Sequence, residues 1–116
     1  MKASYWQRGE SLDYINPTED KIEAGEAIAL GDRIGIAGTD IRPGGLGTVH
    51  VMGVYEFPKK DKAEMAVGTE DYFTEEGITS EAASGEGASA ANNIVAGFVV
   101  APSPAESTKV YVKINA

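Results

Sequence analysis

Residues 27–38 read AIALGDRIGIAG and carry the pattern that decides the fold class. Two short apolar runs, 27–30 and 33–37, are each closed by a glycine that can start a turn. Runs of this length, bounded by turn residues and rich in branched apolar side chains, are typical of β-strands and too short for helices. The stretch therefore predicts two consecutive short strands.

The same pattern continues along the chain. Gly53 separates two further runs and predicts a bulge or a sharp bend, and residues 42–47 have the Pro and Gly content of a turn. Residues 63–67 fit either a helical turn or an extended piece. About eight short strands with closely spaced turns indicate an all-β protein, a small single-domain β-barrel or sandwich. The remaining strand-like runs are 11–15, 48–52, 54–57, 70–74, 78–79, 94–101 and 108–114.

Two segments do not fit the strand pattern. Residues 1–8 precede the first turn, and we expect them to form a flexible N-terminal arm. Residues 80–93 are mostly Ser, Ala, Gly and Glu, which offer too little apolar surface to offset the entropy of ordering. The expected organisation is an arm at 1–8 and one β domain at 9–116, with a mobile loop at 80–93.

Composition excludes several classes of function. The chain has no cysteine, so disulfides, zinc–thiolate sites and thiol nucleophiles are excluded, as suits assembly in a reducing cytoplasm. The formal net charge of −8 argues against nucleic acid as a partner, because DNA binding requires a basic surface. No apolar run approaches the roughly 18 residues of a membrane span, so no membrane partner is expected.

Catalytic motifs are not found either. His50 is the one histidine and has no sequence partner for a triad or a metal site, so we expect an ordinary surface residue. The turn before Thr48 lacks the lysine of a phosphate-binding loop and leads into a strand. One acidic cluster is predicted to be a solvated rim, and its members are Glu70, Asp71, Glu75 and Glu76. The sequence thus predicts no catalytic residue, no cofactor, no metal and no enzymatic activity.

Two sets of residues are candidates for contact with a partner. Tyr5 and Trp6 are large aromatics near the terminus; they either pack back on the body, the favoured interpretation, or anchor a partner. Arg8 adds a cation to the same arm. The second set is basic and lies in a loop that we expect to be solvated. It consists of Lys59, Lys60 and Lys62.

The N-terminal half resembles the small capsid cement, or decoration, proteins of tailed phages. The resemblance rests on turn glycines and strand residues from about residue 9 to 59 and is looser beyond residue 60. Some members of that family carry a RecA/RadA-type recombinase label, which the missing nucleotide loop does not support. The matching motifs are Gly9-Glu10-x-Leu12-Asp13-Tyr14-x-Asn16, Ile22-x-Ala24-Gly25-Glu26, Gly31-Asp32-x-Ile34-Gly35-Ile36-Ala37, Asp40-Ile41-x-x-Gly44, Gly47-x-Val49-x-Val51 and Gly53-Val54-Tyr55-Glu56-Phe57-Pro58-Lys59.

The resemblance implies a structural protein of the virion that binds the exterior of the phage head and stabilises it. Its implied partner is the major capsid protein, and its implied form is a homo-oligomer, with a trimer favoured. Two alternatives stay open: a recombinase-like accessory protein of phage DNA processing, and a subunit of a virion fibre or tail.

Overall fold

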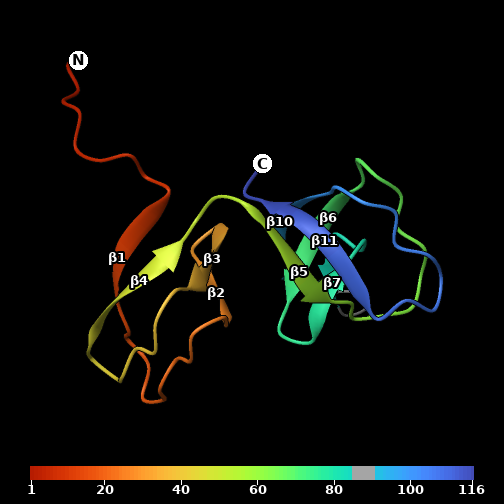
Figure 1. Cartoon of the computed structure of the whole chain (residues 1–116), viewed down its shortest axis with the longest axis horizontal. Helices are drawn as coiled ribbons and strands as arrows, with labels where there is room; N and C mark the ends of the chain where they lie inside the picture. The colour runs from red at the N-terminus through yellow and green to blue at the C-terminus, as the bar shows by residue number, and fades with distance from the viewer. Residues whose placement is uncertain (85–90) are drawn as a thin grey trace.

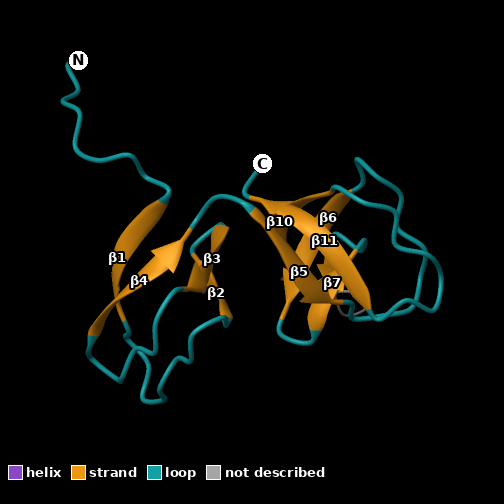
Figure 2. Cartoon of the chain, in the orientation of Figure 1, coloured by secondary structure: helices purple, strands orange, loops and turns teal. Residues whose placement is uncertain are grey.

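The computed structural model describes residues 1–84 and 91–116, and every regular element in these ranges is a β-strand (Figure 2). The all-β prediction is therefore confirmed. The strands are β1 (Ser11–Ile15), β2 (Ala27–Leu30), β3 (Arg33–Ala37), β4 (Leu46–His50), β5 (Val54–Pro58), β6 (Glu70–Thr74), β7 (Gly77–Thr79), β8 (Ala83–Ser84), β9 (Ala91–Asn92), β10 (Ile94–Val99) and β11 (Lys109–Ile114).

The first sheet has four antiparallel strands in the order β1-β4-β3-β2. Strands β2 and β3 form the hairpin predicted from residues 27–38, with Ala27 opposite Ile36. Gly31 in its turn adopts a φ of 61°, a conformation that favours glycine over residues with a β-carbon. Strand β4 starts two residues earlier than the sequence indicated, because Leu46 and Gly47 pair with the end of β1.

The second sheet has five strands in the order β5-β11-β10-β6-β7. Its two edge strands approach each other, and a parallel bridge joins Lys59, just after β5, to Ile78 in β7. A β-carbon on Gly77 would lie 2.6 Å from the Pro58 carbonyl oxygen, so only glycine allows this approach. The two sheets form a sandwich-like arrangement, and the barrel that the sequence also permitted is not closed.

The chain passes from the first sheet to the second at Gly53, whose φ of 120° confirms the predicted bend (Figure 1). Strand β3 contacts β10, so the two sheets share one hydrophobic core. Ile34 and Val99 are fully buried in it. A second, smaller cluster lies within the first sheet and contains Ile22, Ala37, Ile41 and Val49.

Two segments left open by the sequence now have a conformation. Residues 63–66 form no helical turn: Met65 makes an antiparallel bridge with Ser103, and a turn begins at residue 67. Within the expected mobile loop at 80–93, strands β8 and β9 pair with each other, and the Asn93 amide donates a hydrogen bond to the Ala82 carbonyl. The centre of that loop, residues 85–90, lies outside the described residues.

Candidate functional site

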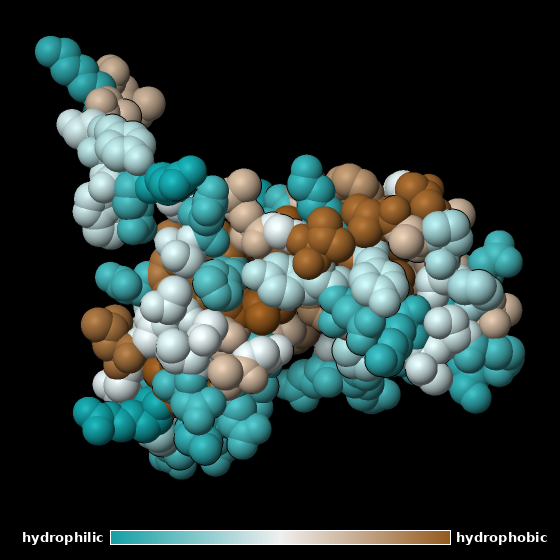
Figure 3. Space-filling view, in the orientation of Figure 1, coloured by the Kyte–Doolittle hydropathy of each residue, from teal (hydrophilic) through white to brown (hydrophobic). Residues whose placement is uncertain are grey.

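The N-terminal arm, residues 1–8, extends away from the first sheet and stands clear of the body (Figures 1 and 3). The side chains of Tyr5 and Trp6 are 84% and 87% exposed. The expectation that they pack back on the body is therefore not met. Arg8 lies 3.9 Å from Glu10, and both side chains are largely in solvent. The arm thus presents two unburied aromatic rings, which are groups enriched at binding hot spots.

Lys59 does not belong to an exposed basic loop, and this prediction was wrong. The residue is only 9% exposed, because its ammonium group turns inward. The Nζ donates to the Ala63 carbonyl oxygen at 2.5 Å and to the Pro104 carbonyl oxygen at 3.4 Å. Lys59 therefore joins two loops of the second sheet and is not free to contact a partner.

The other two lysines of that loop are accessible. Lys60 is exposed, and Lys62 lies 3.6 Å from Glu106 in a surface ion pair. The arm leaves from β1, whereas this loop follows β5 at the far side of the molecule (Figure 1). The sequence-based contact residues therefore form two separate sites.

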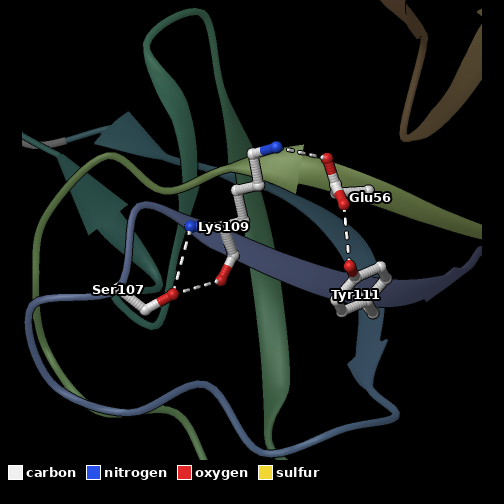
Figure 4. Close-up of polar contacts among 4 residues, drawn as sticks. All are labelled: Glu56, Ser107, Lys109 and Tyr111. Atoms are coloured by element: carbon white, nitrogen blue, oxygen red, sulfur yellow. Dashed lines mark hydrogen bonds and ion pairs between the residues drawn. The ribbon is translucent and has the colours of Figure 1, made fainter.

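An additional polar cluster occupies the outer face of strands β5 and β11 (Figure 4). The Lys109 ammonium lies 3.0 Å from the Glu56 carboxylate, and the Tyr111 hydroxyl donates to the other oxygen of Glu56 at 2.7 Å. These contacts arise because Glu56 is directly opposite Tyr111 in the register. Sequence reasoning missed this cluster, although the alternation of 109–114 places Lys109 and Tyr111 on one face.

The three groups shift one another's proton affinity. The hydrogen bond from Tyr111 and the contact with Lys109 lower the pKa of Glu56. The same carboxylate raises the pKa of Lys109 and of Tyr111. All three side chains are at the surface, so the cluster is a solvent-exposed charged network in which water screens the mutual attraction of the groups.

Asp71 contradicts the prediction that the acidic cluster is a solvated rim. It is fully buried, while its neighbour Glu70 on the opposite face of β6 is exposed. Desolvation raises the pKa of Asp71 to about 7; the Gly97 backbone N–H opposes this rise, and the charge of Glu70 adds to it. Among the described residues, neither carboxylate oxygen has a hydrogen-bond partner with good geometry.

Catalytic geometry is not assembled in the part of the chain that the structure describes. Within residues 1–84 and 91–116, no group of three His, Cys, Asp or Glu side chains is placed to hold a metal. The turn at residues 42–45 leads into strand β4 and not into a helix, as the sequence predicted, so this turn has no phosphate-binding helix behind it. Across the same ranges, none of the elements is a helix long and apolar enough to cross a membrane.

Comparison with known proteins decides the family. A family model described as phage cement protein matches residues 6–114, which is nearly the whole chain. The chain belongs to the phage cement protein family. No curated protein and no solved structure matches this cement protein significantly.

Family membership agrees with the geometry. The family description supports a structural role at the phage capsid. The features that distinguish the surface of this cement protein are an exposed aromatic arm, two accessible lysines and a charged cluster around Glu56.

Proposed function

We propose that this cement protein binds the exterior of the phage head and stabilises it, with the major capsid protein as its partner. The observation that carries the proposal, beside the family match, is the arm with its exposed Tyr5 and Trp6. Exposing two large aromatic rings to water is unfavourable in free energy, and a partner that covers them removes this penalty. In the mature virion that partner is the capsid surface.

The capsid is stabilised by many modest contacts that are repeated over one shell. A typical interface buries about 800 Å² per partner, which a body of this size supplies from one face. Each bound copy adds its binding free energy to the cohesion of the capsomers beneath it, so the head resists the outward pressure of packaged DNA. An extended arm can also add a strand to an open sheet edge of the capsid protein.

The proposed contact residues divide between the two exposed sites. The arm contributes Tyr5, Trp6 and Arg8, while Lys60 and Lys62 supply positive charge from the second sheet; Lys59 is excluded because it is buried. We propose residues 1–8 as an attachment arm and residues 9–116 as one folded domain. The protein assembles in the host cytoplasm and acts as a homo-oligomer, with a trimer favoured by its family resemblance.

The direct test is to mix the purified protein with expanded capsids that lack it and to count bound copies. Saturable binding is expected, and no saturable binding to the cognate head would end the proposal. Deleting residues 1–8 is expected to weaken attachment at least ten-fold while the thermal unfolding midpoint stays nearly unchanged. Equal loss of attachment and of thermal stability would show that the arm belongs to the core.

A matched pair of substitutions separates the aromatic rings from the rest of the arm. Tyr5→Ala with Trp6→Ala is expected to weaken capsid binding, because both rings are exposed and available. Ser4→Ala with Gln7→Ala changes the same arm without touching either ring and serves as the control. Equal binding of the two double variants would exclude the rings as anchors.

A further inference from the structure

A groove of about 570 Å³ lies between the two sheets on the surface of the body. Its walls come from the start of β2, from β5 and from the turn between β6 and β7. Aromatic and acidic residues both line it, and none of the described residues that line it is basic. The aromatic residues are Tyr55, Phe57 and Phe73, and the acidic residues are Glu26, Glu56 and Glu75. Glu56 is already paired with Lys109, so Glu26 and Glu75 are the carboxylates that a cationic partner would meet.

The arm has the complementary composition. Residues 1–8 contain Lys2 and Arg8 and no acidic residue, whereas the chain as a whole has a net charge of −8. Removing those two positive charges leaves −10 for residues 9–116. In an extended chain, side chains alternate between two faces, so Lys2, Trp6 and Arg8 share one face. That face carries an aromatic ring between two cations.

We propose that the arm of one copy lies in the groove between the sheets of a second copy. The ring of Trp6 covers the aromatic residues of the groove, and Lys2 and Arg8 face its carboxylates. Fully extended, the chain from Lys2 to Arg8 spans about 20 Å, and the ring of Trp6 lies between the two cations. This docked arm belongs to the free protein in solution; on the capsid the arm leaves the groove, and Tyr5 and Trp6 contact the capsid surface as proposed above.

The geometry favours docking of the arm in the groove of a second copy over docking in the groove of the same chain. Gly9 adopts a φ of 80° where the arm leaves the sheet, and from there the arm runs outward from the body (Figure 1). Docking in its own groove would require the arm to reverse and cross the whole width of the first sheet, because β1 and β2 are its opposite edges. The arm of a neighbouring copy needs no such reversal.

The chain carries its own probe, because Trp6 is its one tryptophan. The experiment measures the emission maximum of the unmodified protein across a wide range of concentration at low salt, with the mass followed by sedimentation. Burial of Trp6 in a second copy is expected to shift the emission to the blue as the mass rises above that of a monomer. Emission that stays at the exposed value at every concentration would overturn the proposal, as would a blue shift in a protein that remains monomeric.

Paired variants place the arm in this groove and not elsewhere on the second copy. Glu26→Gln with Glu75→Gln removes two exposed carboxylates from the groove, and Glu19→Gln with Glu64→Gln removes two exposed carboxylates outside it. The groove variant is expected to need at least ten-fold more protein to reach half of the blue shift, and the control to match the unmodified protein. Equal midpoints in the two variants would refute the groove as the site. Capsid binding is measured separately, so failure here does not depend on the proposed function.

Discussion

Asn115 and Ile34 lie 81 residues apart and are joined by two hydrogen bonds. The Ile34 amide donates to Asn115 Oδ1 at 3.1 Å, and Asn115 Nδ2 donates to the Ile34 carbonyl at 2.9 Å. The same Nδ2 donates to the Val51 carbonyl at 2.9 Å. One side chain at the end of the second sheet therefore satisfies backbone groups of the first sheet and of the linker between them.

Replacing Asn115 by alanine should lower the free energy of unfolding by about 2 kcal/mol, because buried backbone groups lose their partners. Chemical denaturation measures the change. Asn115 has a φ of 57°, so Asn115→Gly is the matched control: it loses the same hydrogen bonds but tolerates that backbone conformation. We expect the glycine variant to be the more stable of the two, and wild-type stability in both would refute the role given to this side chain.

Asp71 should make stability depend on pH in an unusual direction. Its pKa is about 7 in the folded protein and near 4 in the unfolded chain, so between these values the folded state holds a proton that the unfolded state has released. The free energy of unfolding therefore falls as pH rises from about 4 to 7, by up to about 1.4 kcal/mol per pH unit, and levels off above.

Asp71→Asn removes this titration while it keeps the shape of the side chain. The difference in unfolding free energy between the variant and the wild type isolates Asp71 from the other carboxylates. The variant is expected to gain stability relative to wild type as pH increases from 4 to 8. A difference that stays constant over this range would show that Asp71 does not titrate there.

Gly97 should tolerate no side chain. It lies at a bulge between β10 and β6, and a β-carbon would be 1.9 Å from the Lys113 carbonyl oxygen of the neighbouring strand. We expect Gly97→Ala to cost more than about 3 kcal/mol, because backbone has to move. Gly68→Ala is the comparison, since Gly68 also has a positive φ but has open space around it, and it should cost only about 1 kcal/mol. Thermal unfolding of both variants tests the difference.

Lys59 and Lys60 are adjacent but should respond differently to truncation. Lys59→Ala removes the ammonium group that joins the loops at Ala63 and Pro104, so a loss of about 1–3 kcal/mol is expected. Lys60 is exposed, and Lys60→Ala should change stability by less than about 0.5 kcal/mol. Urea denaturation of both variants decides the matter, and equal midpoints would contradict the buried position of Lys59.

Local sequence patterns predicted most of the strands, because strand pairing here follows alternation and turn glycines. The hairpin of residues 27–38 and the bend at Gly53 are features of neighbouring residues, and both were predicted. The start of β4 was missed because its first residues, Leu46 and Gly47, pair with Ile15 and Tyr14 of β1, and pairing between distant segments leaves no local signal.

The candidate site was less predictable for the same reason. The burial of Asp71 and the inward turn of Lys59 depend on which strands cover them, and an isolated stretch of charged residues looks solvated. The cluster of Glu56, Lys109 and Tyr111 depends on the register between strands 55 residues apart. The exposure of Tyr5 and Trp6 was one of two open alternatives, and only the position of the arm distinguishes them.

The separation of the two sheets along the chain governs the order in which the protein is completed during translation. Strands β1 to β4 are all made before Gly53 leaves the ribosome, so the first sheet can pair early. Ile34 and Ile36 nevertheless belong to a core that is complete only once β10 and β11 emerge almost at the end of synthesis. A nascent chain therefore carries an incompletely covered apolar strand until late in elongation, and a ribosome that stalls late leaves a product prone to aggregate.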